Sequence, residues 1–147
     1  KARERAQLGG AAAAPASVLD GVALGLPALS RADKLQRRAA RAGFDWPEIG
    51  PVFAKVEEEL AEVRAEVQAC AAPERIEAEL GDLLFSCVNL ARHAGVDPEA
   101  ALRGANERFA RRYRQVEAAF AALERGLHEA TPEELDAAWE EAKRGQG

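Results

Sequence analysis

A pattern of apolar and acidic residues occurs twice in this chain, and the two copies are twenty residues apart. In each copy apolar side chains recur at intervals of three and four residues, which is the spacing of the buried stripe of an amphipathic helix. Two carboxylates flank each stripe, Glu59 and Glu62 in the first copy and Glu79 and Asp82 in the second. The apolar positions are Val56, Leu60, Val63 and Val67, and then Ile76, Leu80, Leu83 and Cys87. The repeat therefore predicts two helices with matching buried faces.

Only a short segment, from Cys70 to Pro73, separates the two predicted helices. Helices joined by so short a turn pack antiparallel as a hairpin, which would bring the four carboxylates near one another. Carboxylates at close range oppose each other's ionisation unless a cation lies between them. All four are hard oxygen ligands, and no His or Cys stands among them. Mg²⁺ or Mn²⁺ therefore fits this arrangement, whereas Zn²⁺ or a copper ion does not.

A solvated acidic surface is the alternative explanation for these residues. The first helix also carries Glu57, Glu58 and Glu66, and a glutamate-rich helix usually presents such a face to water. The second copy favours the metal site, because Glu79 and Asp82 lie in an otherwise apolar segment where solvated acids are less expected. We therefore predict that both helices contribute ligands to one cation centre.

Composition and charge narrow the classes of protein to which this chain can belong. A length of 147 residues is enough for one domain, and the net charge of −5 argues against a general nucleic-acid-binding protein. No apolar run approaches the length of a membrane span, so we expect no membrane partner. Aromatic residues make up only 5% of the chain, which favours a core completed by a homodimer. Cys70 and Cys87 form neither a disulfide framework nor a metal motif, which favours a reducing, cytoplasmic setting.

Further helices are predicted around the acidic pair. Ser30 to Asp33 reads as a capping box for a helix over residues 31–42, and a loop with Phe44 and Trp46 follows it. Asp97 and Pro98 predict the start of a helix that continues to about Arg125, and a second capping box begins at Thr131. We interpret residues 1–27 as a tail and linker left from a preceding domain, and residues 28–147 as one all-α domain.

The acidic motifs resemble those of a known family. Glu58-Glu59-x-x-Glu62, a gap, and Glu79-x-x-Asp82 look like the metal motif of the MazG family of nucleoside triphosphate pyrophosphohydrolases. Similar segments extend from about residue 26 to residue 120 in the same order. They are Leu26-Pro-Ala-Leu29, Lys34-Leu-Gln36, Gly43-Phe-Asp-Trp-Pro47, Gly81-Asp-Leu-Leu-Phe85, Asn89-Leu-Ala-Arg-His93 and Asn106-x-x-Phe109-x-x-Arg112. The resemblance is to the C-terminal domain of a two-domain MazG, and it implies a MazG-like helical bundle that is dimeric.

The resemblance also implies a reaction and roles for individual residues. The expected activity is hydrolysis of nucleoside triphosphates to a monophosphate and pyrophosphate, with Mg²⁺ as cofactor and Mn²⁺ as an alternative, in a house-cleaning role on the nucleotide pool. Glu59, Glu62, Glu79 and Asp82 would hold the metal, and Glu58 and Glu59 would be catalytic. The residues expected to contact substrate are Lys55, Arg75, Arg108, Arg112, Asn106, Trp46 and Trp139.

Other interpretations of the same residues remain open at this point. Arg108 and Arg112 lie one turn apart on a helix, where basic residues can serve solubility alone. Trp46 could be a core plug, and Trp139 could dock on another helix instead of covering a ligand. A non-catalytic α-helical dimerisation module is the alternative from another class. A related all-α dUTP or dCTP pyrophosphohydrolase is the alternative within the enzyme class.

Overall fold

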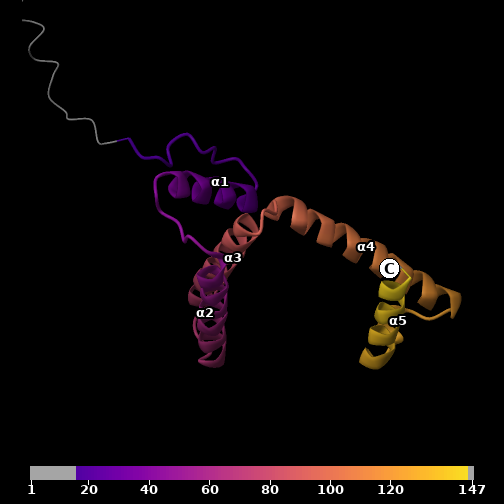
Figure 1. Cartoon of the computed structure of the whole chain (residues 1–147). Helices are drawn as coiled ribbons and strands as arrows, with labels where there is room; N and C mark the ends of the chain where they lie inside the picture. The colour runs from indigo at the N-terminus through magenta and orange to yellow at the C-terminus, as the bar shows by residue number, and fades with distance from the viewer. Residues whose placement is uncertain (1–15, 146–147) are drawn as a thin grey trace, which may run out of the picture. The chain divides into compact units, whose positions relative to one another are not determined.

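The computed structural model describes residues 16–145, and this part of the chain contains helices and no strands. The helices are α1 (Ala28–Arg41), α2 (Ile49–Gln68), α3 (Pro73–His93), α4 (Pro98–Ala122), a short 3₁₀ helix (Leu127–Glu129) and α5 (Pro132–Arg144), as labelled in Figure 1. The all-α prediction is thereby confirmed. The helices fall into two compact units, one ending at Ala94 and the other beginning at Gly95. None of the described helices combines the length and apolar character needed to cross a membrane.

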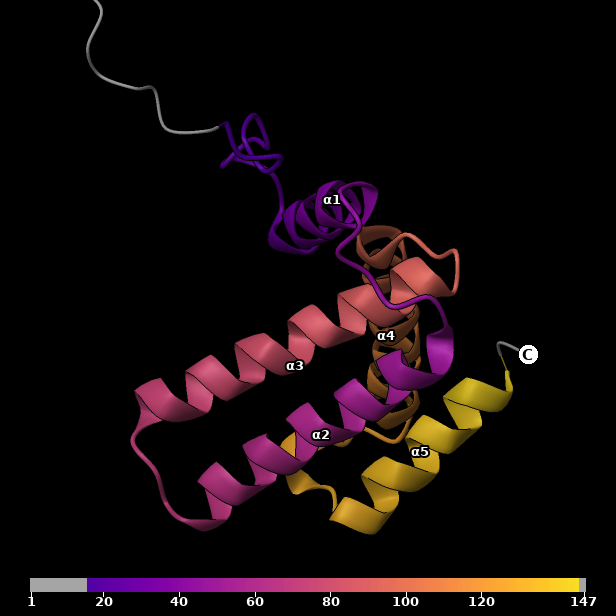
Figure 2. The same cartoon turned by 60° about the vertical axis from the view of Figure 1, so that its left-hand side comes forward.

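In the first unit, α2 and α3 lie antiparallel and side by side as the predicted hairpin (Figure 2). Cys70 takes a left-handed conformation with φ of 51°, and the Ala71 N–H donates to the carbonyl of Glu66 at 3.0 Å. Pro73 occupies the first turn of α3, where its missing N–H costs nothing. Arg75 Nη2 lies 2.6 Å from Glu66 Oε1 and joins the two helices beside the turn.

The face that the hairpin buries differs from the predicted one. Within α2 the buried residues are Val52 and Glu59, so a carboxylate of the acidic motif lies inside the helix contact. Four positions of the predicted apolar stripes are exposed instead, namely Leu60, Val67, Leu80 and Cys87. The prediction of two buried stripes is therefore wrong at these positions. The physical reason is that α2 and α3 pack mainly on each other and α1 covers only part of α3, so each of the two helices is covered over a narrow arc within this unit.

The first helix begins earlier than its sequence suggests. Pro27 precedes α1 with φ of −51°, and no side chain caps the helix, so the predicted capping box from Ser30 to Asp33 is wrong. Proline already holds the backbone near helical φ, which allows the helix to start upstream of the serine. The end is as predicted, because Gly43 has φ of +96° and stops the helix. The α1 helix packs on α3, where Gln36 Nε2 donates to the carbonyl oxygen of Phe85 at 3.0 Å.

Part of the predicted tail and linker packs against α1. Arg38 donates from Nη1 to the carbonyl oxygens of Val18, at 3.4 Å, and Asp20, and Val22 is buried. Residues 1–15 of that predicted segment lie outside the described residues.

The second unit consists of α4, the 3₁₀ turn and α5. Asp97 caps α4 by accepting from the N–H groups of Glu99 and Ala100, as the sequence predicts. The helix ends at Ala122 instead of Arg125, because Glu124 takes a left-handed conformation with φ of 55°.

The capping box between Thr131 and Glu134 at the start of α5 is confirmed. The core of this unit is formed by Val116, Phe120 and Ala142, with Leu127, Ala130, Leu135, Ala138 and Trp139 packed against it.

Candidate metal centre

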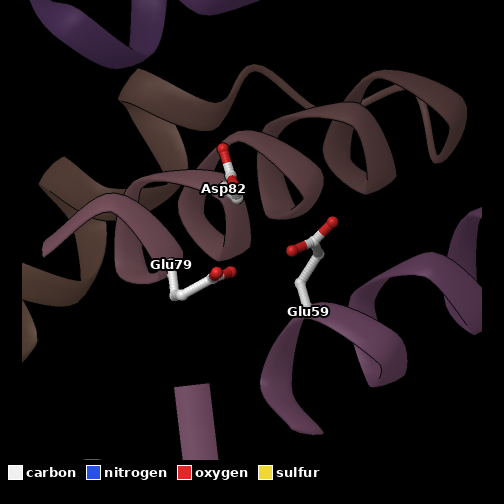
Figure 3. A group of neighbouring side chains, drawn as sticks. All are labelled: Glu59, Glu79 and Asp82. Atoms are coloured by element: carbon white, nitrogen blue, oxygen red, sulfur yellow. The ribbon is translucent and has the colours of Figure 1, made fainter. Parts of the chain in front are cut away.

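Three carboxylates converge on the inner face of the α2–α3 hairpin. One oxygen each from Glu59, Glu79 and Asp82 lies within 4.8 Å of the other two. Figure 3 shows Glu59 reaching from α2 toward Glu79 and Asp82, which lie one turn apart on α3. Glu59 is buried, Glu79 is half-buried and Asp82 is exposed, so the cluster has an inner and an open side. The antiparallel packing of the two copies of the acidic motif is what brings these groups together.

The inner oxygens of this cluster have no hydrogen-bond donor. Glu59 Oε2 and Glu79 Oε2 are both buried, and neither has a partner among the described residues. Buried carboxylate oxygens almost always accept hydrogen bonds, because an unsatisfied one costs a large part of its lost hydration. A divalent cation between the helices would satisfy both atoms at once. Since every available ligand is a carboxylate oxygen, the residues fit Mg²⁺ or Mn²⁺.

Glu62, the fourth predicted ligand, lies at the edge of this group. Its side chain is exposed and does not belong to the set of three converging oxygens. Repulsion from Glu59 and a hydrogen bond with Glu79 nevertheless raise the pKa of Glu62 above its usual value. Glu62 thus lies near enough to the cluster for its ionisation to be affected by Glu59 and Glu79, and it is exposed enough to contact a bound cation or substrate.

One cation of the chain itself contacts the acidic group. Lys55 Nζ lies 2.9 Å from Glu59 Oε1 and 3.4 Å from Glu58 Oε2. The hydrogen bond with Glu59 raises the pKa of Lys55, so this side chain stays protonated and offsets part of the negative charge. Glu58 is exposed, and Lys55 brings it beside the buried carboxylate.

The remaining predicted substrate residues are distributed over both units. Arg75 is engaged with Glu66 and helps to close the hairpin. Trp46 is part of the same unit, in the loop before α2. Four others belong to the second unit, namely Asn106, Arg108 and Arg112 on α4 and Trp139 on α5.

Trp139 does dock on another helix, as one of the two interpretations predicted. Its ring centroid lies 5.4 Å from that of Phe109 on α4, which itself stacks on Tyr113 at 5.9 Å. Arg108 and Asn106 are exposed, and Arg112 is half-buried.

An ion-pair network that the sequence did not reveal fixes the loop before α2. Arg92 Nη1 and Nη2 lie 2.9 and 2.7 Å from the two carboxylate oxygens of Asp45, and His93 Nε2 lies 3.0 Å from Oδ1. The hydrogen bond from Arg92 holds the pKa of Asp45 far below its usual range. Both partners stand in segments that resemble the MazG family, but 47 residues separate Asp45 from Arg92, so no local pattern shows the pairing.

A cavity of about 500 Å³ lies beside this network. Its walls come from α1, the loop that contains Phe44 and Trp46, and the second half of α3. The lining is mostly apolar, with Gln36, Asn89 and Arg92 as its buried or half-buried polar members. Both the cavity and the carboxylate cluster lie within the first unit.

The fold and the site together define an all-α protein with a carboxylate centre suited to a divalent cation. Residues 51–117 match the MazG nucleotide pyrophosphohydrolase domain, a family of hydrolases. This match includes every residue of the carboxylate cluster. The resemblance of the motifs to the MazG family is thereby confirmed, with the match to the family over residues 51–117.

Individual relatives are similar over most of this chain. A nucleoside triphosphate pyrophosphohydrolase from Escherichia coli (strain K12) is 46% identical over 145 residues, which cover 98% of this chain and 53% of that protein. A protein from Thermotoga maritima, named nucleoside triphosphate pyrophosphohydrolase/pyrophosphatase MazG, is 43% identical over 120 residues, or 82% of this chain and 46% of that protein. The uncharacterized protein YabN from Bacillus subtilis is 42% identical over 129 residues, or 86% of this chain and 26% of that protein. The chain thus spans about half the length of the first two relatives.

Proposed function

We propose that this chain hydrolyses nucleoside triphosphates to a nucleoside monophosphate and pyrophosphate, using Mg²⁺ or Mn²⁺, and so controls the nucleotide pool. The observation that carries the proposal is the carboxylate cluster, whose buried oxygens on Glu59 and Glu79 have no donor in the described chain. The names of the similar proteins from Escherichia coli and Thermotoga maritima support the substrate class. In the reaction, water attacks one phosphorus atom of the anhydride between the α and β phosphates. That phosphate takes the oxygen of water, and the other product leaves with the bridging oxygen.

Glu59, Glu79 and Asp82 would hold the cation, and Glu62, at the edge of the cluster, would be a further ligand. A bound divalent cation supplies positive charge against the phosphate oxygens and lowers the pKa of a coordinated water. Glu58 is exposed beside this group and is suited to orient the attacking water and accept its proton. Lys55 contacts Glu58 and Glu59, and its ammonium group can turn to a phosphate oxygen when those carboxylates engage the cation.

The arginines of α4 are proposed as further phosphate contacts. Arg108 and Arg112 are one helical turn apart, and a guanidinium group can bind two phosphate oxygens at once. Asn106 belongs to the same unit and is proposed as an additional substrate contact. The part of Trp139 that its contact with Phe109 leaves uncovered is proposed as another. Arg75 is proposed as a weaker phosphate contact than these arginines, because its guanidinium group already pairs with Glu66.

A homodimer is proposed on the basis of apolar side chains that the hairpin leaves exposed. Phe53, Leu60 and Val67 repeat at intervals of seven residues along α2, and all three are exposed. Leu80 and Leu84 form a similar exposed pair on α3. A second copy of the chain would bury these stripes in a bundle of helices. The two free cysteines of the described chain support a reducing, cytoplasmic setting.

Product analysis tests the proposed reaction. The chain is incubated with ATP, GTP, CTP, UTP, dCTP and dUTP, each with Mg²⁺ or with EDTA, and the products are followed by phosphorus NMR. We expect pyrophosphate and a monophosphate in the presence of the cation only. Orthophosphate with a diphosphate would contradict the cleavage position, and no turnover of any substrate would favour a non-catalytic dimerisation module. Turnover of a single pyrimidine nucleotide would place the chain with the narrower pyrophosphohydrolases.

A further inference from the structure

We propose that one side of α1 is a docking surface for an acidic segment of a partner protein. This basic face consists of the five cationic side chains of the helix, Arg31, Lys34, Arg37, Arg38 and Arg41. It lies on a different helix from the carboxylate cluster, and the contact requires neither metal nor nucleotide. The charge of α1, the arrangement of these side chains and their lack of acidic partners support the proposal.

The charge of α1 is opposite to that of the rest of the chain. The helix holds five basic residues and one acidic residue, so its net charge is +4. Since the whole chain has a net charge of −5, the residues outside α1 together carry −9. In the same unit, α2 has five acidic and two basic residues, and α3 has four acidic and two basic residues. The helix α1 is therefore a positive element in an acidic unit.

The basic residues gather on one side of the helix. With 3.6 residues per turn, all five positions fall within an arc of about 120°. The opposite side meets α3, where Gln36 donates to the carbonyl oxygen of Phe85 at 3.0 Å. Figure 2 shows α1 beside the second half of α3. Within this unit the packing of α1 on α3 thus uses the side of the helix that carries no cation.

Most of these cations have no carboxylate partner on α1. Arg37 pairs with Asp33, the one acidic residue of the helix, at 2.8 Å. Lys34 and Arg41 are exposed and form no ion pair within residues 16–145. Arg38 donates to two backbone carbonyl oxygens of the preceding segment, which hold its guanidinium group in place without cancelling its charge. The basic face therefore presents positive charge that the helix itself leaves unbalanced.

Helix stability and solubility do not explain this distribution. Cations stabilise the last turn of a helix, where Arg38 and Arg41 lie, but they oppose the helix dipole in the first turn, where Arg31 lies. A helix that is charged for solubility usually mixes both signs. The α5 helix does so, because each of its basic residues pairs with a glutamate of the same helix.

The spacing of the exposed cations fits an acidic helix. At 1.5 Å of rise per residue, Arg37 and Arg41 lie about 4.5 and about 10.5 Å beyond Lys34 along the helix axis. Carboxylates at intervals of three and four residues on a partner helix repeat these distances, so each cation can face one of them. Surfaces of opposite charge that match in this way speed association and select the partner.

A nucleic acid fits this surface less well. Its phosphates would continue beyond the short row of three exposed cations and would meet the net negative charge of α2 and α3. An acidic protein segment can confine its charge to the length of the row. The observations therefore favour a protein partner.

Fluorescence anisotropy with three labelled probes tests the proposal. The probes are a helical peptide with glutamates at intervals of three and four residues, the same peptide with glutamines, and a thymidine oligonucleotide of equal charge. Each is titrated with the full chain at low salt, without metal or nucleotide. We expect the glutamate peptide to bind saturably and more tightly than the oligonucleotide, and the glutamine peptide not to bind.

Two charge-reversal variants of equal net charge locate the surface. Lys34→Glu combined with Arg41→Glu reverses the two unpaired cations of the basic face and should weaken the glutamate peptide about tenfold. Arg64→Glu combined with Arg103→Glu is the matched control, because both arginines are exposed and form no ion pair in the described part of the chain. The control should bind the peptide almost as well as the parent, since screening weakens distant charges.

Circular dichroism should show both variants to be as helical as the parent. If the reversal unfolds α1, Lys34→Gln combined with Arg41→Gln removes the same charges without introducing repulsion, and it should again weaken only the glutamate peptide.

Three results would overturn the proposal. The first is no saturable binding of the glutamate peptide. The second is tighter binding of the oligonucleotide, which would assign the basic face to nucleic acid. The third is equal weakening of the peptide by both charge-reversal variants, which would show that net charge governs binding and α1 does not. Because the assay contains no nucleotide and no metal, its result is independent of the proposed hydrolysis.

Discussion

Replacing one carboxylate of the cluster should stabilise the metal-free protein. Glu79 has carboxylate neighbours in Glu59 and Asp82, and its Oε2 is buried without a donor. At 4.8 Å, the upper limit of these separations, one pair of like charges repels by about 1 kcal/mol in the dielectric of water and by about 3.5 kcal/mol at an effective dielectric constant of 20. Since Asp82 is exposed, we take the lower value. Glu79→Gln should then raise the free energy of unfolding by about 1 kcal/mol and the melting temperature by about 3 °C.

The same substitution should abolish the response to metal. Mg²⁺ at ten times its dissociation constant should stabilise the parent protein by about 1.4 kcal/mol, because it binds the folded arrangement alone. Thermal unfolding followed by circular dichroism, with EDTA and then with Mg²⁺, measures both effects in one series. We expect Glu79→Gln to melt above the parent in EDTA and to gain nothing from Mg²⁺.

Two comparison variants make this prediction specific. Glu77→Gln removes an exposed carboxylate two positions away on α3 and should stay within about 0.5 kcal/mol of the parent while keeping the metal response. Glu59→Gln relieves the same repulsion but also breaks the 2.9 Å pair with Lys55, so little net gain is expected in EDTA. The reasoning is refuted if Glu79→Gln melts below the parent in EDTA, or if it retains the full Mg²⁺ increment.

Three further predictions concern contacts that lie within one unit or the other. Thr131→Ala removes the capping hydrogen bond at the start of α5 and should cost about 1 kcal/mol in denaturant unfolding. The hydrogen bond from Arg125 lowers the pKa of Glu134 to about 2. The stabilisation by this ion pair is therefore present at neutral pH and is lost as pH falls from about 5 toward 2. Glu134→Gln should make the melting temperature depend less on pH over that range. Asp45→Asn removes the ion pairs of Arg92, whose side chain is only 11% exposed, and should cost about 2 kcal/mol with an unchanged Mg²⁺ increment.

Local signals predicted most of the fold. Asp97 and Thr131 cap their helices as expected, and Pro73 opens α3, because capping depends on residues three or four positions apart. The hairpin itself also follows from the short turn and the two matching motifs. The helix start predicted at Ser30 was wrong because Pro27, three positions earlier, precedes a helix that begins without a side-chain cap.

The burial pattern could not be predicted in the same way. Periodicity shows that Leu60 and Leu80 belong to apolar stripes, but it does not show which part of a stripe a neighbouring helix will cover. Here the contact between α2 and α3 includes the carboxylate of Glu59, and both leucines are exposed. The pairing of Asp45 with Arg92 was hidden for a related reason, since it depends on the packing of a loop against the far end of α3.

Two different electrostatic environments lie along α3. Near its start, Glu79 and Asp82 concentrate negative charge that a polyphosphate can approach only together with a cation. Near its end, Asn89 and Arg92 contribute to a cavity whose charge is already balanced by Asp45. A polyphosphate should therefore bind near Glu79 and Asp82 only together with Mg²⁺, with an affinity that falls as salt rises, whereas Arg92 offers it no uncompensated positive charge at the other end of the helix.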